Sequence, residues 1–302
     1  MCKVKKEKFT IKQFNQKYSN DNDCLHEIFL NRYSNTKECS NCNKSFSFHK
    51  VSNRKCYACA YCGHQLHPLA NTIFHKSSTS LKNWFYAMFL FSCSKNGVSG
   101  KELERQLGVT YKCAYRIAKQ IRMLFDETNS NNMLSNIVEV DETYHGGKEI
   151  NKHKDKKTPH SQGRSIKSKT PIVGAVERQG NVVAKVVCDT TENTVKHFIR
   201  TNVSISSDVQ TDEYKSYNNL AKLGYTHSRV NHGVKQYVQG NNYTNTIEGF
   251  WSQLKRSIHG TYHFVSPKYL QTYVNEFTYR YNRRNDVQAI FHGVVKQAWT
   301  LC

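Results

Sequence analysis

Residues 245–260 read "NTIEGFWSQLKRSIHG", and this stretch predicts an amphipathic helix with an acidic residue near its start. Its apolar residues recur at helical spacing and line one face: Ile247, Phe250, Trp251, Leu254 and Ile258. Glu248 lies beside that face, and Gly249 destabilises such a helix by about 1 kcal/mol relative to alanine. One explanation is a capping box formed by Asn245 and Glu248, which stabilises a helix start. The other explanation is a chemical role for Glu248.

Two aspartates upstream lie in segments that predict β-strands. Asp141 lies inside "NIVEVDETY" (136–144), and Asp212 lies in "SDVQTDEY" (207–214). An ionised aspartate is disfavoured in a strand by propensity and by burial, so each position indicates a function. If the two strands are neighbours in one sheet, both aspartates emerge near its centre, within reach of Glu248. The alternative is that they are turn residues and partners for the abundant lysines.

Three carboxylates that converge on one point repel one another strongly unless cations neutralise them. Hard oxygen ligands of this kind suit Mg²⁺ or Mn²⁺. Two such ions can activate the attacking oxygen and stabilise the leaving oxygen of a phosphodiester. We therefore predict a two-metal site at Asp141, Asp212 and Glu248.

The surrounding pattern predicts an α/β domain over residues 134–302. Its expected elements are a strand at 136–144, two strands in 170–189 that turn at 179–181, a helix at 191–203, a strand at 207–214, a helix at 216–224, a strand at 225–232 and the helix from 246. This order allows the first and fourth strands to pair in parallel through a right-handed crossover. Residues 148–170, which are rich in Lys, His, Ser and Gly, predict a mobile basic loop.

Residues 36–70 contain two Cys-x-x-Cys pairs in a polar segment without helical period. Cys39 and Cys42 form the first pair, Cys59 and Cys62 form the second, and sixteen residues lie between them. This spacing is typical of a tetrahedral, structural zinc site. Cys56 offers a less suitable pairing with Cys59. Buried free thiols are the other interpretation, but a segment with so little aliphatic core needs a metal to fold.

Residues 1–35 predict a helical segment, and residues 80–130 predict a longer helical region with a DNA-binding pattern. Within it, "SGKELERQLGVTYKCAYRIAKQIRML" (99–124) predicts two helices joined by a turn at 108–110, with these residues inward: Leu103, Leu107, Ala114, Ile117 and Ile121. This is a helix-turn-helix pattern. The second helix is expected to present a basic face, namely Lys112, Arg116, Lys119 and Arg122. The alternative is a helical hairpin whose basic face is only solvated.

The composition predicts a polyanionic partner. The 302 residues include 44 Lys and Arg but 23 Asp and Glu, which gives a net charge of +21. Each phosphate contact by Lys or Arg releases bound counterions, so DNA is the expected partner. No run of about 18 apolar residues is present, so we expect no membrane binding. Eleven cysteines without a secretory signal predict a reducing compartment.

Several segments together resemble transposases of the IS1595 insertion-sequence family, the ISXO2-like DDE group that is related to Merlin transposases. The segments that carry this resemblance are "VEVDETYHGGK", "TDEYKSY", "VNHGVKQYV", "NTIEGFWSQLKRSIHGTYHFVS", "EFTYRYNRR" and, upstream, "CSNC" with "CAYCGHQ". Thirty-five residues separate Asp212 from Glu248, and Lys255 follows Glu248 by seven positions. This spacing resembles the D,D-35-E pattern of retroviral-integrase-like nucleases.

The resemblance implies an α/β ribonuclease H-like (retroviral integrase-like) catalytic domain, preceded by a small zinc ribbon and a helix-turn-helix. It implies a DDE transposase that binds the terminal inverted repeats of its insertion sequence and performs two-metal cleavage and strand transfer into target DNA. Asp141, Asp212 and Glu248 would hold two Mg²⁺ or Mn²⁺ ions, Lys255 would complete the catalytic set, and the four cysteines would hold structural Zn²⁺. Asn245 is the alternative third ligand, since some family members are described as having Asn as the third residue, and Asn245 lies three positions before Glu248.

Double-stranded DNA is the expected partner. The expected contact residues are Lys112, Arg116, Lys119, Lys255 and Arg256, with Tyr243 as a further candidate that could equally be a packing residue. Two transposon ends must be brought together, so we expect at least a homodimer on DNA. The expected location is a bacterial cytoplasm, at the nucleoid, or a nucleus if the host is eukaryotic. Two other functions remain open: a repressor without catalysis, and a general ribonuclease H-like nuclease.

Overall fold

The computed structural model describes residues 9–126, 133–147, 151–159, 165–230 and 243–299. The chain forms two compact units, one of residues 1–125 with 283–302 and the other of residues 126–282. Within the described ranges, no helix combines the length and the apolar character needed to cross a membrane.

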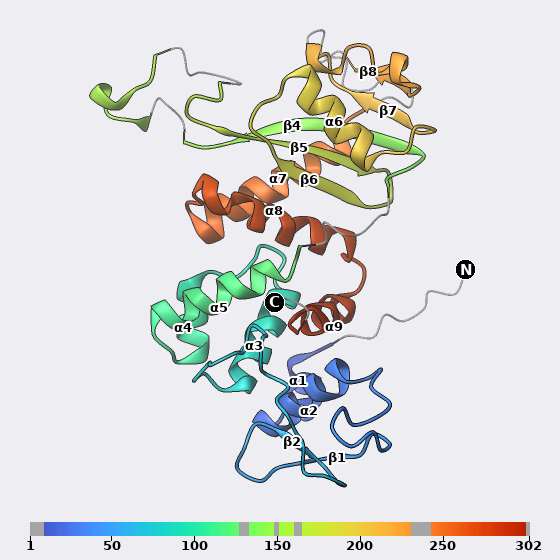
Figure 1. Ribbon diagram of the computed structural model, residues 1–302. Helices are drawn as coiled ribbons and strands as arrows, with labels where there is room; N and C mark the ends of the chain where they lie inside the picture. Colours follow the sequence, from blue (N-terminus) through green and yellow to red (C-terminus); the bar gives the residue numbers. More distant parts are fainter. Residues whose placement is uncertain (1–8, 127–132, 148–150, 160–164, 231–242, 300–302) are drawn as a thin grey trace. The chain divides into compact units, whose positions relative to one another are not determined.

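The first unit is built around helix α3 (Leu81–Cys93). The side chains of Trp84, Phe85, Met88 and Phe91 on α3 are fully buried, as expected for a helix that is apolar on most sides. Helices α2, α4, α5 and α9 all pack against α3. The other helices of this unit are α1 (Ile11–Lys17), α2 (Asp21–Arg32), α4 (Gly100–Leu107), α5 (Tyr111–Met123) and α9 (Val287–Gln297) (Figure 1).

Helices α4 and α5 follow each other through a tight turn, as the sequence predicts. Gly108 ends α4 in the left-handed conformation, with φ of 62°, and the Thr110 side chain caps α5 by accepting a hydrogen bond from the backbone of Cys113. The predicted inward residues are all buried: Leu103, Leu107, Ala114, Ile117 and Ile121.

A small antiparallel sheet occupies the cysteine-rich segment. Its strands are β1 (Phe48–Lys50), β2 (Tyr57–Cys59) and β3 (Gln65–Leu66), in the order β1-β2-β3. The ring of Tyr57 stacks on Phe29 of α2, with 3.8 Å between the centroids. This aromatic contact attaches the small sheet to the helical part of its unit.

The second unit contains a five-stranded mixed sheet in the order β6-β5-β4-β7-β8. Its strands are β4 (Ile137–His145), β5 (Thr170–Glu177), β6 (Val182–Val186), β7 (Asp208–Thr211) and β8 (Thr226–Arg229). Strands β4, β5 and β6 are antiparallel, whereas β7 runs parallel to β4 and to β8. The prediction that the first and fourth strands are parallel neighbours is therefore confirmed.

Helices cover both faces of this sheet (Figure 1). Helix α6 (Glu192–Asn202) packs on one face, where Val138 and Val140 are buried. Helices α7 (Asn245–Ser257) and α8 (Pro267–Asn282) pack on the other face, where the predicted apolar stripe of α7 is buried. Because side chains alternate along a strand, Glu139 and Asp141 face α7.

The predicted helix at 216–224 is not formed. Two short 3₁₀ turns, Lys215–Tyr217 and Ala221–Leu223, take its place. Asn219 between them has φ of 65°, a left-handed conformation that interrupts a helix. Tyr217 and Leu220 are buried in the core beneath α6, so tertiary packing outweighs helical propensity here. Of the predicted basic loop 148–170, residues 151–159 and 165–170 are described, and they include a 3₁₀ turn at Lys154–Lys156.

Candidate active site and metal centres

Three carboxylates meet where β7 ends beside β4. Asp141, Glu142 and Asp212 each place one oxygen within 4.8 Å of the other two. The parallel pairing aligns Val140 with Thr211, the last residue of β7, so Asp141 and Asp212 come next on adjacent strands. The sheet thus brings together two of the three acidic residues that the sequence predicts as metal ligands.

The cluster is electrostatically unfavourable without a cation. Burial, followed by the negative charges of Glu142, Asp212 and Glu248, raises the pKa of Asp141 to about 8. A carboxylic acid that holds its proton near neutral pH reflects the burial of Asp141 first and the negative charge around it second. A divalent cation would relieve this repulsion, and carboxylate oxygens are the ligands that Mg²⁺ and Mn²⁺ prefer.

Glu142 was not anticipated in this cluster. Strand alternation places it on the face opposite Asp141, and its Oε2 accepts a hydrogen bond of 2.7 Å from the hydroxyl of Tyr217. β7 ends at Thr211, and Asp212 directly follows that end, where its carboxylate meets those of Asp141 and Glu142. Glu142 can therefore serve as a ligand or as the group that orients Tyr217.

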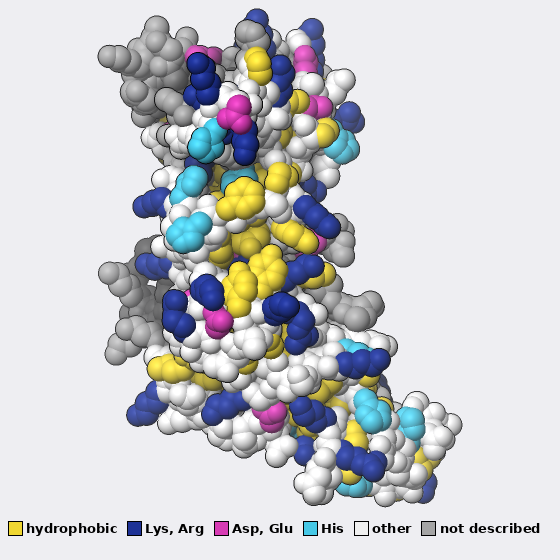
Figure 2. Space-filling model, turned by 90° about the vertical axis from the view of Figure 1, so that its left-hand side faces the viewer, with side chains coloured by type: hydrophobic (Ala, Val, Ile, Leu, Met, Phe, Trp, Pro, Cys, Tyr) yellow, Lys and Arg dark blue, Asp and Glu magenta, His cyan; other side chains and the backbone are white. Residues whose placement is uncertain are grey.

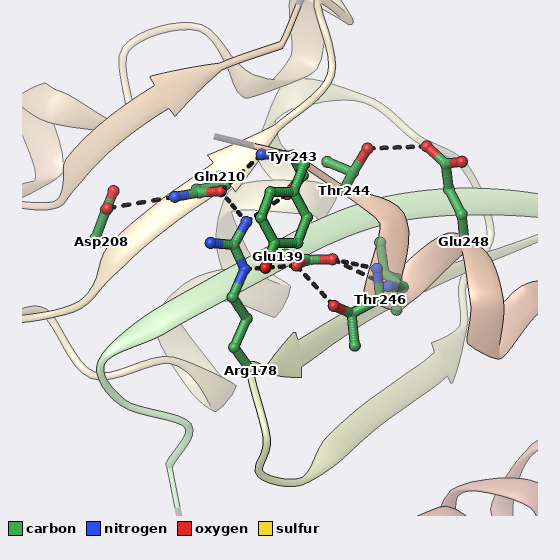
Figure 3. Close-up of polar contacts among 9 residues, drawn as sticks. Glu139, Arg178, Asp208, Gln210, Tyr243, Thr244, Thr246 and Glu248 are labelled. Carbon is green, nitrogen blue, oxygen red and sulfur yellow. Dashed lines mark hydrogen bonds and ion pairs between the residues drawn. The ribbon is translucent and has the colours of Figure 1, made fainter. Parts of the chain in front are cut away.

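Glu248 lies in the first turn of α7, outside the group that meets within 4.8 Å. Its Oε1 accepts a hydrogen bond of 2.9 Å from the hydroxyl of Thr244, the residue just before the helix (Figure 3). Its negative charge nevertheless reaches Asp141, whose pKa it raises. The N-cap residue of α7, Thr244, makes no side-chain capping hydrogen bond, so the capping box considered for Asn245 and Glu248 is not formed. The roles of Glu248 and Asn245 as metal ligands remain predictions.

Lys255 and Arg256 are exposed near the end of α7. Lys255 lines a small surface hollow together with Thr143, His145 and His259. Thr143 and His145 lie two and four residues after Asp141, on the same face of β4. Lys255 thus lies close to β4, on the face of the sheet to which Asp141 also points.

The basic face expected on α5 is only partly present. Lys112 and Lys119 are exposed, whereas Arg116 lies 5.5 Å from the ring of Trp84 and donates a hydrogen bond to Ser77. The prediction that Arg122 faces outward is wrong: it is 3% exposed and donates to the carbonyl of Val98. A long cationic side chain with apolar neighbours can bury its stem and bond to the backbone.

Two tyrosines, which sequence reasoning missed, join the lysines on α5. Tyr111 and Tyr115 are 43% and 41% exposed, and their rings are 6.1 Å apart. Their spacing of four residues was visible in the sequence, but their exposure was not. Figure 2 shows dark blue Lys and Arg side chains over the visible surfaces of both units, with few acidic side chains among them.

The four predicted zinc ligands converge. One sulfur atom from each of Cys39, Cys42, Cys59 and Cys62 lies within 4.8 Å of the others. The distance is 3.8 Å from Cys39 Sγ to Cys62 Sγ and 3.9 Å from Cys42 Sγ to Cys59 Sγ. Sulfur ligands that surround zinc tetrahedrally at about 2.3 Å lie about 3.8 Å apart. The donor set therefore fits Zn²⁺.

The two cysteine pairs form matching turns. The backbone N–H of Cys39 donates to the carbonyl oxygen of Lys44, and that of Cys59 donates to the carbonyl oxygen of His64. The residue that follows the second cysteine of each pair has a positive φ, 54° at Asn43 and 72° at Gly63. Hydrogen bonds from the Asn41 amide and the His64 backbone lower the pKa of Cys62 to about 6, which favours the thiolate that a metal needs.

Cys56 lies outside the sulfur cluster. It is buried, and its thiol donates to the side-chain oxygen of Gln65 at 3.7 Å. The alternative pairing of Cys56 with Cys59 is therefore not the one that the structure assembles.

Two solved structures show a weak likeness to this chain. A simian T-cell lymphotropic virus intasome in complex with the PP2A regulatory subunit B56 gamma aligns with a TM-score of 0.30 and 12% identity over 64% of this chain and 70% of that chain. A pre-cleavage Mos1 transpososome aligns with a TM-score of 0.28 and 12% identity over 68% of this chain and 73% of that chain. These TM-scores are too low to assign a fold.

Sequence comparisons are more specific. An uncharacterised protein in transposable element ISH50 of Halobacterium salinarum is 24% identical over 82% of this chain and 86% of its own length. An uncharacterised transposase-like protein of Haemophilus influenzae is 30% identical over 33% of this chain and 80% of its own length. Residues 133–282 match the family described as the ISXO2-like transposase domain. This chain belongs to the ISXO2-like, IS1595-type transposase family.

Proposed function

We propose that this protein is a DDE transposase that cuts DNA at the ends of its own insertion sequence and joins them to target DNA. The observation that carries the proposal is the meeting of Asp141 and Asp212 beside Glu142, with Glu248 on the adjacent helix, in a chain of this family. We assign the second unit to the ribonuclease H-like fold, supported by its mixed sheet with a parallel β4–β7 pair at the site.

Asp141 and Asp212 would hold the metal ions, with Glu248 as the third ligand. Divalent cations bound there would activate the attacking oxygen and stabilise the leaving oxygen of the phosphodiester. Asp141 gives up its proton when it becomes a ligand, because its charge is then compensated. Lys255 and Arg256 attract the DNA strand to the carboxylate cluster, which on its own repels phosphates.

The first unit would locate the terminal repeats. The cysteine cluster holds structural Zn²⁺, and helices α4 and α5 act as a helix-turn-helix. Lys112, Lys119, Tyr111 and Tyr115 form the exposed face of α5 that would enter the major groove. Cleavage of both ends in one complex requires at least two copies on DNA, in the bacterial nucleoid or in a nucleus.

The proposal is tested with end-labelled DNA that contains the inverted repeats flanking the gene. Wild-type protein with Mg²⁺ or Mn²⁺ should release labelled strands, whereas Asp141→Asn and Asp212→Asn should reduce the rate by at least about 1,000-fold and retain DNA binding. Glu213→Gln is the matched control, because Glu213 is exposed and directly follows Asp212. It should leave the rate unchanged.

The other function classes are distinct outcomes of the same experiment. Binding without product at every metal concentration would favour a repressor, and cleavage that ignores the repeat sequence would favour a general nuclease. Glu248→Gln, Glu142→Gln and Asn245→Ala identify the third ligand, since among these three variants the one that removes a ligand should raise the metal concentration needed for cleavage most sharply.

A further inference from the structure

The most deeply buried carboxylate of the sheet face under α7 is not part of the acidic cluster. Glu139 is 0% exposed and lies two residues before Asp141 on β4. Its Oε1 accepts hydrogen bonds from Arg178 Nε at 2.7 Å and from the Thr246 hydroxyl at 2.8 Å. Its Oε2 accepts from the backbone N–H groups of Thr246 at 2.8 Å and Ile247 at 3.1 Å. One side chain of β4 thus binds the start of α7 (Figure 3).

These contacts replace the missing cap of α7. The first N–H groups of a helix have no partner within the helix and need one from elsewhere. Thr244, the N-cap residue, makes no side-chain capping bond. Glu139 accepts from the second and third helical residues, the groups that a local cap usually satisfies. Its negative charge also lies at the positive end of the helix dipole.

Arg178 extends the connection to two more segments. Its guanidinium donates to Gln210 Oε1 on β7 at 2.5 Å and to the carbonyl oxygen of Tyr243 at 2.8 Å. The Tyr243 ring lies 3.4 Å from the guanidinium carbon, and the Tyr243 backbone N–H donates to Gln210. Tyr243, considered as a DNA contact from the sequence, therefore packs on Arg178. The residue that leads into α7 is held from two sides.

We propose that Glu139 and Arg178 are positioning residues that fix the first turn of α7, and with it Glu248, relative to Asp141. The proposal rests on the proposed metal-dependent DNA cleavage. Two residues of strand separate Glu139 from Asp141, about 7 Å, and two residues of helix separate Thr246 from Glu248, about 3 Å of rise. The hydrogen bonds at Glu139 thus connect the strand of the first acidic residue to the helix of the third, within two residues of each.

A buried ion pair is a poor way to gain stability alone, since well-packed apolar side chains serve as well. The hydrogen bonds of the pair do, however, require a defined distance and angle between donor and acceptor, whereas apolar contacts do not. The arrangement of Glu139 matters for stability and for geometry, so the experiment must separate the two effects.

Glu139→Gln keeps the shape of the side chain but places an amide donor against the donors of Arg178 or α7. The matched control is Glu276→Gln on α8, where a 0% exposed glutamate pairs with Arg280 at 2.6 Å and accepts from Tyr262. Both variants break a buried ion pair of the same unit. Only the first breaks the connection between β4 and α7.

Three quantities are compared in full-length protein: the unfolding midpoint, Mn²⁺ binding by electron paramagnetic resonance, and the cleavage rate at saturating metal. Glu139→Gln should weaken Mn²⁺ binding about tenfold and slow cleavage about 100-fold, as expected for a misplacement near 1 Å. Glu276→Gln should leave both within about threefold of wild type, although its unfolding midpoint falls similarly.

Equal Mn²⁺ affinity and rate in the two variants would overturn the positioning role. If Glu139→Gln does not fold, Thr246→Val and Thr246→Ser decide the question, because the valine removes the hydroxyl donor to Glu139 and the serine keeps it. The valine should lose Mn²⁺ affinity and the serine should retain it, and equal affinities would refute the proposal. Failure of wild type to cleave refutes the proposed function instead, since the Mn²⁺ comparison does not depend on cleavage.

Discussion

Replacing Gly174 with alanine is expected to displace α7 beside the acidic cluster. Gly174 on β5 is aligned with Asp141 on β4. A Cβ atom at Gly174 would lie 2.6 Å from Cζ2 and Cη2 of Trp251 and 3.3 Å from Cδ1 of Ile247, and both residues are buried on α7. Because carbon atoms pack at about 3.5–4.0 Å, the indole or the helix must move by about 1 Å.

The expected magnitude follows from this overlap. Insertion of a methyl group into a packed core destabilises by about 1–3 kcal/mol. In a unit of this size each kcal/mol lowers the melting temperature by roughly 2–4 °C. A shift of about 1 Å in the helix that carries Glu248 should also slow DNA cleavage by about 100-fold.

Gly249→Ala is the matched control, with the opposite sign. Apart from its chain neighbours and the backbone of its own helix, no heavy atom lies within 4 Å of a Cβ at Gly249. Alanine within a helix is favoured over glycine by about 1 kcal/mol, so Gly249→Ala should stabilise the protein. The two glycine-to-alanine changes, at Gly174 on β5 and at Gly249 on α7, should therefore shift the free energy of unfolding in opposite directions.

The measurement is urea unfolding followed by circular dichroism, for wild type, both glycine variants, Trp251→Phe and the double variant Gly174→Ala/Trp251→Phe. Phenylalanine removes the indole atoms that clash, so the double variant should be less destabilised than the sum of the single variants, with a coupling of about 1 kcal/mol or more. Unchanged stability of Gly174→Ala, or strict additivity, would refute the close packing of α7 on β5.

Three further predictions concern other parts of the chain. Cys59→Ser should abolish zinc retention and the circular dichroism of the small sheet, whereas Cys56→Ser should keep one zinc per chain by atomic absorption. The pKa of Asp141 is about 8 in the folded, metal-free protein and 3.8 in the unfolded chain, so the folded protein holds this proton at pH values where the unfolded chain has lost it. The free energy of unfolding should therefore fall as the pH rises from about 4 to about 8. Urea titrations at several pH values measure this slope, which Asp141→Asn should lack. In anisotropy assays of repeat-DNA binding, Lys119→Gln should reduce the slope of the logarithm of the binding constant against the logarithm of the salt concentration by about one. Arg122→Gln should instead lower the melting temperature, because Arg122 is buried.

Features that depend on local periodicity could be predicted from the sequence. The apolar stripe of α7 and the parallel pairing of β4 with β7 follow from spacing and element order, because burial selects side chains at the period of each element. Asp141 and Asp212 came together for the same reason. Their closeness could be predicted once the two strands that carry them were expected to be neighbours.

Features that depend on where an element ends could not be predicted. Glu142 joins the cluster at the point where β7 stops at Thr211, and strand boundaries are weakly encoded in a single sequence. Arg122 was expected at the surface because helical spacing does not show which neighbours cover it. In both cases the deciding contact lies far away in the chain.

The unusual first turn of α7 has its explanation in β4. A helix that was stabilised by its own residues would use an N-cap side chain on its second and third N–H groups, but here Glu139 accepts from both. This support from β4 frees Glu248, which contacts Thr244 and remains exposed. The same support tolerates Gly249 in the next position, despite its lower helical propensity. If Glu248 is the third metal ligand, as we propose, it cannot also cap its own helix, and the buried side chain of Glu139 on another strand holds the start of α7 instead.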